Sequence, residues 1–578
     1  MKQLLLGNKA IARGLWEAGV KYVSSYPGTP STEITEEVAE FSEVYAEWAP
    51  NEKVALESAM GASLAGARAF TAMKHVGLNV AADPLFTAAY TGVNGGLVVC
   101  VADDPAMHSS QNEQDSRHYA RAAKLPMLEP SDSAECRDFT CLAYEISEAF
   151  DTPVLLRTCT RVAHSQSLVE LHERSELPLK EYKKDPSKYV MNPGFAYKRH
   201  FIVEDRLLKL REYSESSPLN FEEIGDTGVG YVCSGTCYQY IKEAIPGASV
   251  FKIGMSFPMP LEKIRAFAAK VDKLIVVEEL DGVFENEIRA AGIRVDGGKD
   301  IFGCIGELSQ SKIRAALGLE LPESAEFDRP LPARPPVMCA GCPHRGVFYV
   351  LNKLRLTVTG DIGCYTLGAA APLSAVDSVL CMGASIGMLH GFNTVRPETS
   401  GKTVAVIGDS TFLHSGITAL TDVAYNQSVS TVLILDNSIT GMTGHQQNPA
   451  TGLTLKLKAV PPVSLEKVCE AVGIRRVRSV DAGNLKEIET ALKEELAADE
   501  PSVIICRKPC QLLKYVKPKP ALSVDTDKCR GCKSCMRIGC PAIKFASGKA
   551  EIDPSQCVGC GLCSQMCAFG AIGEGKHE

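Results

Sequence analysis

The chain has 578 residues, of which 45% are hydrophobic and 22% charged, so it is globular in composition and too long for one hydrophobic core. Its net charge of −8 argues against nucleic acid as the main partner, and no apolar run approaches the roughly 18–20 residues needed to cross a bilayer. The start, MKQLLLGNKA, is not typical of a signal peptide. We therefore expect a cytoplasmic protein of three or four domains, whose 22 cysteines are thiols or metal ligands rather than disulfides.

Short apolar runs alternate with amphipathic, helix-like stretches along most of the chain. The segment at 51–79 predicts a helix of small residues packed close to a neighbour, followed by a strand. Five runs rich in Val, Ile and Leu predict buried strands of parallel sheets, at 96–102, 152–158, 273–279, 403–409 and 431–437. We therefore expect an α/β protein built from doubly wound sheets.

Three polar or proline-rich segments predict domain boundaries. Residues 213–228 are polar and rich in turn formers, residues 322–336 carry five prolines, and residues 514–520 form a basic, proline-containing tether. These breaks predict four domains, which span residues 1–200, 226–318, 335–512 and 521–578.

An aspartate and an asparagine stand at the ends of two predicted strands in the third domain. Asp409 ends the strand at 403–409, and Asn437, 28 residues further on, ends the strand at 431–437. The carboxyl ends of parallel strands meet at one edge of a sheet, which is where ligands bind in doubly wound folds. Carboxylate and amide oxygens suit Mg²⁺, which in turn binds a diphosphate. The pair therefore predicts a metal and diphosphate site.

The fourth domain carries eight cysteines in two quartets with the spacing of iron–sulfur ligands. The second quartet is Cys557-x2-Cys560-x2-Cys563-x3-Cys567, and the first, with one residue more before its last member, is Cys529-x2-Cys532-x2-Cys535-x4-Cys540. A zinc ribbon is the alternative, but it pairs two CxxC units rather than two CxxCxxC triplets. In two-cluster ferredoxins the distant fourth cysteine ligates the other cluster. This pattern predicts one [4Fe–4S] cluster on Cys529, Cys532, Cys535 and Cys567, and another on Cys557, Cys560, Cys563 and Cys540.

The two quartets differ in charge. The second contains no charged side chain except its thiolates, whereas four cations lie in or beside the first: Lys528, Arg530, Lys533 and Arg537. These cations form either a solvated surface, balanced by the acids of the tail, or the face at which electrons leave to an acidic protein. On the second interpretation, the uncharged quartet faces the rest of the chain.

The third domain resembles the thiamine-diphosphate enzymes, whose metal motif has an aspartate and, about 30 residues later, an asparagine. Serine stands here at the third position of that motif, where the family has glycine. Upstream, the segments CAGCPHR (339–345), GDIGC (360–364) and MGAS (382–385) resemble the cofactor loops of the 2-oxoacid:ferredoxin oxidoreductases. In the first domain, YPGTPSTE at 26–33 resembles the opening of the pyrimidine-binding domain of the same family.

The resemblance extends over the whole chain, in the order pyrimidine-binding domain, transketolase-C-like domain, diphosphate-binding domain and ferredoxin-like domain. It is strongest to the large subunits of the branch that acts on aromatic 2-oxoacids such as indolepyruvate. It implies that Mg²⁺ is held by Asp409, Asn437 and the backbone carbonyl of Ile439. It also implies a set of cofactor-binding residues: Cys339, Gly341, Cys342, His344, Gly363, Cys364, Gly383, Ser385, Gly408 and Ser410. Read alone, the cysteines of this set could form half of a zinc or cluster site, but the small residues around them favour a backbone that approaches a cofactor.

Two catalytic residues are implied in the first domain. The threonine of the TPS stretch contacts the substrate carboxylate in this family, which assigns that role to Thr29; locally, Ser31 or Thr32 is also a suitable N-cap for a helix. Thiamine chemistry needs a carboxyl group beside the aminopyrimidine ring, in an apolar site that raises its pKa. Glu52 falls where the family places this group, with Glu57 as the alternative, and either residue could instead lie on a solvated helix face.

The implied activity is oxidative decarboxylation of an aryl 2-oxoacid with coenzyme A, with electrons passing singly through the tail to ferredoxin. The family implies a smaller second subunit and a hetero-oligomer such as a dimer of heterodimers. Other 2-oxoacids (pyruvate, 2-oxoglutarate or branched-chain acids) remain alternative substrates. A non-oxidative decarboxylase is a rival that would need no cluster tail, and a non-catalytic electron-transfer subunit is a rival that would need no intact Asp409, Asn437 and Glu52.

Overall fold

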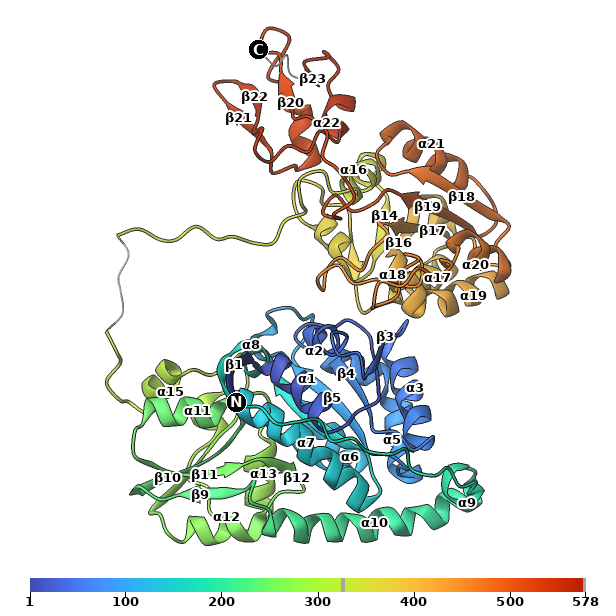
Figure 1. Cartoon of the computed structure of the whole chain (residues 1–578). Coiled ribbons are helices and arrows are strands. Elements are labelled where there is room, and N and C mark those ends of the chain that lie inside the picture. The colour runs from blue at the N-terminus through green and yellow to red at the C-terminus, as the bar shows by residue number, and fades with distance from the viewer. Residues whose placement is uncertain (324–327, 575–578) are drawn as a thin grey trace. The chain divides into compact units, whose positions relative to one another are not determined.

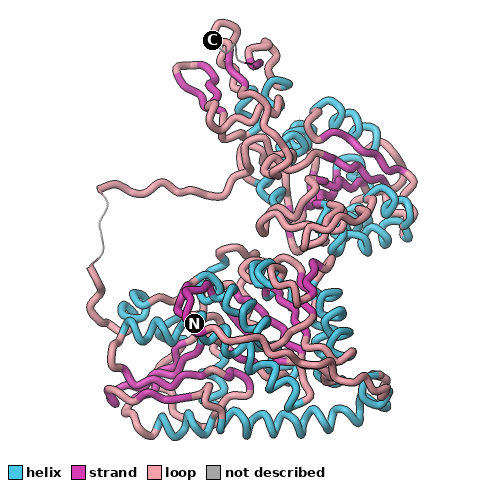
Figure 2. The backbone as a smooth tube through the Cα atoms, viewed as in Figure 1, coloured by secondary structure: helices cyan, strands magenta, loops and turns pink. Residues whose placement is uncertain are grey.

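The computed structural model describes residues 1–323 and 328–574, and its contacts divide into two compact units, Met1–Asp328 and Arg329–Glu578. Each unit contains sheets of mainly parallel strands flanked by helices, which confirms the predicted α/β class (Figure 1, Figure 2). The boundary between the units falls inside the predicted proline-rich connector at 322–336. The finer division into four domains stays a prediction.

The first unit is organised around a seven-stranded sheet. Its strands, in spatial order, are β12 (Met255–Phe257), β6 (Met127–Leu128), β7 (Val154–Cys159), β5 (Leu97–Asp103), β4 (Ala69–Lys74), β2 (Tyr22–Ser25) and β3 (Tyr45–Trp48). All neighbouring pairs are parallel except β12 with β6. Helices cover both faces: α1 (Gly7–Glu17), α2 (Thr32–Val38), α3 (Glu52–Leu64), α4 (His75–Val80), α5 (Ala82–Thr91), α6 (Arg117–Ala123), α7 (Ser133–Phe150) and α8 (Thr160–His164).

The strands of this sheet alternate between two cores, as a sheet buried on both faces requires. In β5, Leu97, Val99 and Val101 join one cluster with Leu56 of α3 and Leu85 of α5. The side chains between them point to the opposite face and are equally buried. The near-continuous apolar run at 96–102 therefore has a direct structural explanation.

A second, four-stranded sheet belongs to the same unit. Its strands, in spatial order, are β13 (Lys273–Val277), β10 (Asp226–Ser234), β11 (Ala248–Ile253) and β9 (Phe221–Glu223). Its helices are α11 (Gly235–Ala244), α12 (Leu261–Ala268), α13 (Val283–Ala290), α14 (Lys299–Phe302) and α15 (Gln310–Ala316). The unit also contains the antiparallel pair β1 (Lys2–Leu6) and β8 (Gln166–Glu170), the short helix α9 (Pro186–Tyr189) and the long helix α10 (Pro193–Ser216).

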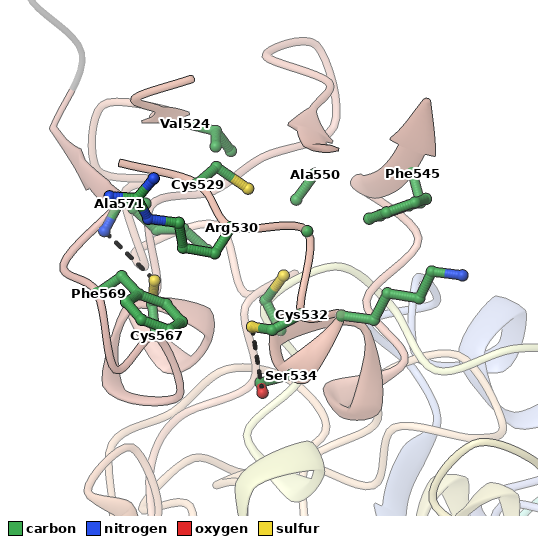
Figure 3. A pocket seen from close by; sticks show the side chains of 14 residues that line it. Val524, Cys529, Arg530, Cys532, Ser534, Phe545, Ala550, Cys567, Phe569 and Ala571 are labelled. Atoms are coloured by element: carbon green, nitrogen blue, oxygen red, sulfur yellow. Dashed lines mark hydrogen bonds between the residues drawn. The ribbon is translucent and has the colours of Figure 1, made fainter. Parts of the chain in front are cut away.

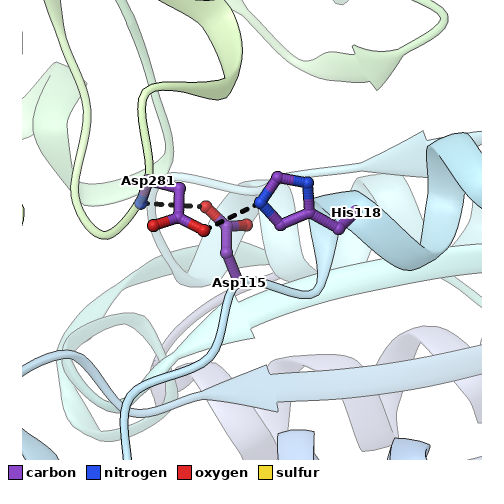
Figure 4. Close-up of side chains that lie close together, drawn as sticks. All are labelled: Asp115, His118 and Asp281. Atoms are coloured by element: carbon purple, nitrogen blue, oxygen red, sulfur yellow. Dashed lines mark hydrogen bonds and ion pairs between the residues drawn. The ribbon is translucent and has the colours of Figure 1, made fainter.

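Buried charges join the two sheets of the first unit. Arg117 pairs with Asp115 at 2.6 Å and, across to the second sheet, with Glu278 at 2.6 Å. Asp115, His118 and Asp281 offer ligand atoms within 4.8 Å of one another (Figure 4). The Asp115 carboxylate, however, already accepts hydrogen bonds from the Arg117 guanidinium. Although burial works against it, Arg117 and Arg157 hold the pKa of Asp115 below its usual range. We therefore interpret this group as a structural connection between the sheets.

The second unit contains a six-stranded, all-parallel sheet. Its strands, in spatial order, are β15 (Ser378–Val379), β14 (Thr357–Gly360), β16 (Thr403–Gly408), β17 (Thr431–Asp436), β19 (Ser502–Arg507) and β18 (Arg476–Asp481). Helices α16 (His344–Leu354) and α21 (Leu485–Glu495) pack on one face. The other face is covered by α17 (Ala384–Val395), α19 (Ile417–Tyr425) and α20 (Leu465–Ala471), with the single turn α18 (Asp409–Thr411) at the end of β16.

The cysteine tail packs on the α16 and α21 face of this sheet. It contains two antiparallel pairs, β20 (Leu522–Val524) with β23 (Ile572–Glu574) and β21 (Ile543–Ala546) with β22 (Lys549–Ile552), and the short helix α22 (Leu562–Gln565). Ile538, Leu562 and Ile572 belong to the same buried cluster as Val347 of α16 and Leu492 of α21. The tail and the sheet domain therefore share one hydrophobic core.

All five predicted parallel strands are confirmed, as β5, β7, β13, β16 and β17, with ends that shift by no more than two residues. The sequence does not predict the long helix α10, which extends into the polar segment at 213–228 that predicts a boundary. Among the described residues, none of the helices has both the length and the apolar character needed to cross a membrane.

Candidate functional site

The predicted metal ligands lie side by side at one edge of the six-stranded sheet. Strands β16 and β17 are parallel neighbours, and Gly408 at the end of β16 pairs with Leu435 near the end of β17. Asp409 and Asn437 therefore follow adjacent strand ends, and both side chains are buried. Ile439 is buried two residues beyond Asn437, and its amide donates to the Asn437 Oδ1 atom at 3.3 Å. The structure brings together all three residues of the predicted metal set.

The charge at this edge fits a cation. Burial, and then the nearby Asp436 carboxylate, raise the pKa of Asp409 to about 7. The carboxylate of Asp436 is compensated by Arg507 at 2.6 Å, whereas Asp409 has a neutral amide donor, Asn448, at 3.2 Å. A buried carboxylate without a cationic partner is costly, and a bound divalent ion would remove that cost. The residues present therefore suit Mg²⁺.

The predicted cofactor loops meet around a second buried aspartate, Asp361. Its carboxylate accepts hydrogen bonds from the amides of Ile362 at 2.8 Å, Gly383 at 2.8 Å and Ser385 at 3.0 Å. This carboxylate fixes the loop that carries Gly363 and Cys364 against the loop that carries Gly383 and Ser385. Asp361 lies inside a segment that the sequence analysis singled out, but its own role was missed because an internal hydrogen-bonding role leaves no separate sequence signal.

Close backbone approach explains several of the predicted glycines. A Cβ atom on Gly408 would lie 2.6 Å from the ring of Tyr365, and one on Gly363 would lie 2.3 Å from the same ring. Gly383 has a φ of 87°, and a Cβ atom there would lie 2.5 Å from Ser415. Ser410 accepts a hydrogen bond from the Thr440 hydroxyl at 2.9 Å. These glycines let the loops at this edge of the sheet, the predicted diphosphate edge, pack together without side chains between them.

His344 lies beside Asn437, at the edge of the sheet that carries the predicted metal ligands (the metal edge). Its Nε2 atom is 3.5 Å from the Asn437 Nδ2 atom, and its ring packs edge-on against Tyr365 with ring centroids 5.9 Å apart. Burial lowers the pKa of His344 to about 4, so the imidazole is neutral at physiological pH. A neutral imidazole offers one donor and one acceptor at this edge.

A group of four thiols lies beside the metal edge: Cys339, Cys342, Cys364 and Cys510. Burial raises the pKa of Cys342 to about 12 and that of Cys364 to about 11, and the neighbouring thiols of the group contribute to both increases. A Cβ atom on Gly441 would lie 3.4 Å from the Cys364 sulfur and 3.6 Å from the Asn437 amide nitrogen. Cys510 is not among the predicted site residues. It lies three residues after β19, the neighbour of β17, so the rule of adjacent strand ends could have found it.

The tail cysteines surround two separate pockets. The first is lined by Cys529, Cys532, Cys535 and Cys567 together with the apolar side chains of Val524, Phe545 and Phe569 (Figure 3). The second is lined by Cys540, Cys557, Cys560 and Cys563. In each pocket three cysteines of one quartet are joined by the last cysteine of the other. The structure therefore brings the thiols together in the crossed arrangement expected for two [4Fe–4S] clusters.

The second pocket lies against the sheet domain. Ala340 and Gly341, from the loop of the first predicted cofactor segment, line it together with the tail cysteines. A Cβ atom on Gly341, whose φ is 71°, would lie 2.2 Å from the Val558 side chain. Cys532, at the first pocket, is exposed. The uncharged quartet therefore faces the body of this unit, as the second of the two interpretations of the charge pattern requires.

The two predicted catalytic residues lie in the first unit. Thr29 is in the loop between β2 and α2 and is partly exposed, and Ser31, at the N-cap position of α2, donates to the Gly28 carbonyl instead of capping the helix. Glu52 begins α3 and is 4% exposed; a Cβ atom on Gly77 would lie 2.6 Å from its carboxylate. Glu57 is exposed and pairs with Lys53, as a residue on a solvated helix face does. Glu52 is therefore a better candidate than Glu57 for the carboxyl group beside the aminopyrimidine ring. The roles of both Thr29 and Glu52 stay predictions.

Comparison with known proteins identifies three family regions. Residues 13–218 match the pyruvate flavodoxin/ferredoxin oxidoreductase, thiamine diphosphate-binding family. Residues 361–506 match the C-terminal TPP-binding domain of thiamine pyrophosphate enzymes, and residues 521–568 match the 4Fe–4S dicluster domain. These matches assign thiamine diphosphate and iron–sulfur clusters as cofactors.

Several curated proteins are similar over the full length. The indolepyruvate oxidoreductase subunit IorA of Archaeoglobus fulgidus is 40% identical over 100% of this chain and 98% of its own length. The IorA subunit of Pyrococcus abyssi is 41% identical over 98% of this chain and 96% of its own. The 2-oxoglutarate synthase subunit KorA of A. fulgidus is 26% identical over 51% of this chain and 93% of its own.

The fold, the diphosphate edge and the cysteine tail define a thiamine-diphosphate-dependent oxidoreductase subunit with an iron–sulfur domain. More narrowly, the chain belongs to the family of indolepyruvate oxidoreductase IorA subunits. The family and the fold class predicted from the sequence are confirmed.

Asp409→Asn should stabilise the metal-free protein at pH 8, and less so at pH 5. The folded-state pKa of Asp409 is raised to about 7, whereas an unfolded aspartate titrates near pH 4. The parent protein therefore loses stability as the pH rises from about 4 to about 7, by a few kcal/mol at most, since one pKa unit corresponds to about 1.4 kcal/mol. Thermal unfolding at the two pH values measures the gain, with the exposed Asp422→Asn on α19 as control. Mg²⁺ with thiamine diphosphate should stabilise the parent and not Asp409→Asn; an equal effect on both would contradict the metal site.

Cys540→Ala and Cys567→Ala should each make the cysteines of a different quartet reactive toward an alkylating reagent. With crossed ligands, removal of Cys540 leaves the second pocket one thiol short, so Cys557, Cys560 and Cys563 become open to alkylation. Removal of Cys567 should expose Cys529, Cys532 and Cys535 instead. Mass spectrometry of the alkylated, natively folded protein reads the pattern. The reverse pattern would mean that each quartet holds its own cluster.

Proposed function

We propose that this chain is the catalytic subunit of a coenzyme A-acylating oxidoreductase that acts on indolepyruvate or a similar aryl 2-oxoacid. In the reaction the bond between the carboxylate and the 2-oxo carbon breaks and CO₂ leaves. The sulfur of coenzyme A bonds to the former 2-oxo carbon, giving the aryl-acetyl-CoA. Two electrons pass one at a time to two molecules of oxidised ferredoxin, and one proton is released.

The observation that carries this proposal is the arrangement of the second unit. Asp409 and Asn437, the thiols around Cys364 and the cysteine tail all belong to one compact body with a continuous core. A diphosphate site and a path for single electrons therefore occur together. A decarboxylase that releases no electrons has no use for such a tail.

Each proposed site residue has a chemical task. Thiamine diphosphate, when bound, supplies a carbon nucleophile and an electron sink for decarboxylation. Asp409, Asn437 and the Ile439 carbonyl would hold Mg²⁺, which neutralises the diphosphate. Glu52 would hold a proton beside the aminopyrimidine ring, a task suited to a carboxyl group shielded from water. Thr29 would donate a hydrogen bond to the substrate carboxylate.

We propose two [4Fe–4S] clusters in the tail, one in each pocket. The four thiols Cys339, Cys342, Cys364 and Cys510 are a candidate site for a third cluster. This group has a CxxC pair like the tail quartets, lies beside Asn437, and adjoins the second tail pocket through Ala340 and Gly341. On this proposal electrons leave the diphosphate edge through the thiol group, the second pocket and then the first.

The proposed partners are a smaller second subunit, ferredoxin as electron acceptor, coenzyme A and the 2-oxoacid. The support for the second subunit is the full-length similarity to proteins that are themselves named as subunits. We propose a hetero-oligomer, such as a dimer of heterodimers, in the cytoplasm. The 26% identity to a 2-oxoglutarate synthase subunit keeps other 2-oxoacids as alternative substrates.

Reduction of methyl viologen by indolepyruvate and coenzyme A, in the presence of the second subunit, tests the proposal. Glu52→Gln should lower this rate by roughly 10²-fold or more, the scale of general acid–base catalysis, because an amide cannot share a proton as a carboxyl group does. Glu57→Gln is the matched control on the same helix and should retain its activity. If the parent protein reduced viologen with another 2-oxoacid but not with indolepyruvate, the proposed substrate would be wrong. Loss of activity in Glu57→Gln alone would move the proton-holding role to that residue.

Reversal of Lys528 and Arg530 to glutamate should slow ferredoxin reduction more than viologen reduction. Both side chains are exposed beside the first pocket, and a basic face there would attract an acidic electron acceptor. Arg537 is a poorer choice because its guanidinium lies over the Tyr349 ring of the sheet domain at 5.6 Å. The ferredoxin rate should also lose part of its dependence on ionic strength, since surface charges are screened over roughly 10 Å at 0.1 M salt. Equal slowing of both acceptors, or of neither, would place the exit face elsewhere.

A further inference from the structure

Arg345 is a buried arginine at the junction between the sheet domain and the tail. It is the second residue of α16 and is 3% exposed. Its guanidinium donates to two carbonyls of the sheet domain, those of Cys339 at 3.0 Å and of Met338. It also donates to two carbonyls of the tail, those of Ile538 at 3.2 Å and of Gly539 at 2.5 Å. One side chain therefore connects the segment before Cys342 to the turn before Cys540.

The charge of Arg345 has no carboxylate partner among the residues that the structure describes. All the acceptors of its guanidinium are backbone carbonyls. The buried Arg117 of the first unit differs, because it pairs with both Asp115 and Glu278. Burial of an unpaired cation is costly, so this charge calls for an anionic counterpart.

The groups that surround Arg345 are thiols that can bind iron. Cys339 and Cys342 on one side, and Cys540 and Cys560 on the other, are close enough to interact electrostatically with its guanidinium. Cys540 and Cys560 line the second tail pocket. An iron–sulfur cluster held by four thiolates carries net negative charge, which would compensate the cation.

The unusual spacing of the first quartet has its structural explanation at the same place. Four residues separate Cys535 from Cys540, one more than in the second quartet. The chain turns at Gly539, whose φ is 67°, and a Cβ atom there would lie 2.8 Å from Pro372 and 3.3 Å from the Arg345 guanidinium. The longer segment therefore places the Ile538 and Gly539 carbonyls against the arginine, and glycine is needed at the turn.

We propose that Arg345 is a positioning residue for electron transfer: its cation raises the reduction potential of the cluster in the Cys540, Cys557, Cys560 and Cys563 pocket and fixes that pocket against the loop at Cys339. The proposal rests on the proposed cluster assignment. A nearby positive charge stabilises the reduced, more negative form of a cluster, so it favours acceptance of an electron from the diphosphate edge. The four carbonyl hydrogen bonds fix the tail at one distance from the thiols around Cys364.

The experiment compares Arg345→Met and Arg345→Lys in the full chain loaded with iron, by redox titration monitored by electron paramagnetic resonance. Arg345→Met removes the cation, so the equilibrium constant for reduction of one tail cluster should fall at least tenfold. For one electron, a tenfold change corresponds to a reduction potential that is lower by about 59 mV. Arg345→Lys keeps the charge, so the reduction potential of this cluster should stay close to that in the parent protein. Lys353→Met, which removes an exposed cation from the same helix, is the matched control and should leave the potentials of both tail clusters at their parent values.

Several results would overturn the proposal. Unchanged potentials in an iron-replete Arg345→Met protein would show that the cation has no effect on the cluster. If Arg345→Met loses iron, the test rests on Arg345→Lys. The proposal requires that Arg345→Lys retain both its iron and the reduction potential of the parent cluster. Equal loss of iron in the two variants would contradict a role for the charge. These readouts need no substrate, so they are independent of whether the enzyme acts on indolepyruvate.

Discussion

The arrangement of the second unit depends on one hydrophobic core that the six-stranded sheet and the cysteine tail build together. Val347 and Leu492 come from the helices of the sheet domain, and Leu562 and Ile572 from the tail, yet they form a single buried cluster. An electron carrier tied only by the basic segment at 514–520 would sample many distances. Shared burial of apolar surface instead holds the second pocket against the loop at Cys339, because separation would expose that surface to water.

Uncompensated buried charge distinguishes the functional parts of the second unit from the structural parts of the first. In the first unit the buried Arg117 is paired with carboxylates, so its burial needs no ligand. In the second unit Asp409 has a neutral amide donor, and Arg345 has only carbonyl acceptors in the described structure. One site suits a cation and the other an anion, as the proposed magnesium site and the proposed iron–sulfur site require.

The sequence was informative wherever a local pattern sets the local structure. Buried parallel strands need continuous apolar runs, so β5 and β16 could be predicted, and adjacent strand ends brought Asp409 and Asn437 together. The tail cysteines could be grouped because their spacing is short and regular.

The missed features depend on contacts between segments far apart in the chain. Asp361 acts through amides that lie 22 and 24 residues away, and Arg345 acts through carbonyls almost 200 residues away. Cys510 follows β19, whose apolar run at 502–507 is not among the five predicted strands, so nothing in the prediction connected it with the sheet edge. The helix α10 was missed at its C-terminal end because its last four residues, 213–216, are polar and continue into a segment rich in turn formers.

The connection between the two sheets of the first unit has a practical consequence for anyone who wishes to shorten this protein. A fragment that ends near residue 200 would lack β12, and the edge of β6 would then present unpaired backbone groups that favour aggregation. It would also leave Arg117 without Glu278 in a buried position. Limited proteolysis should therefore release this region only as a whole, and the polar stretch at 213–228 is a poor place to divide the chain.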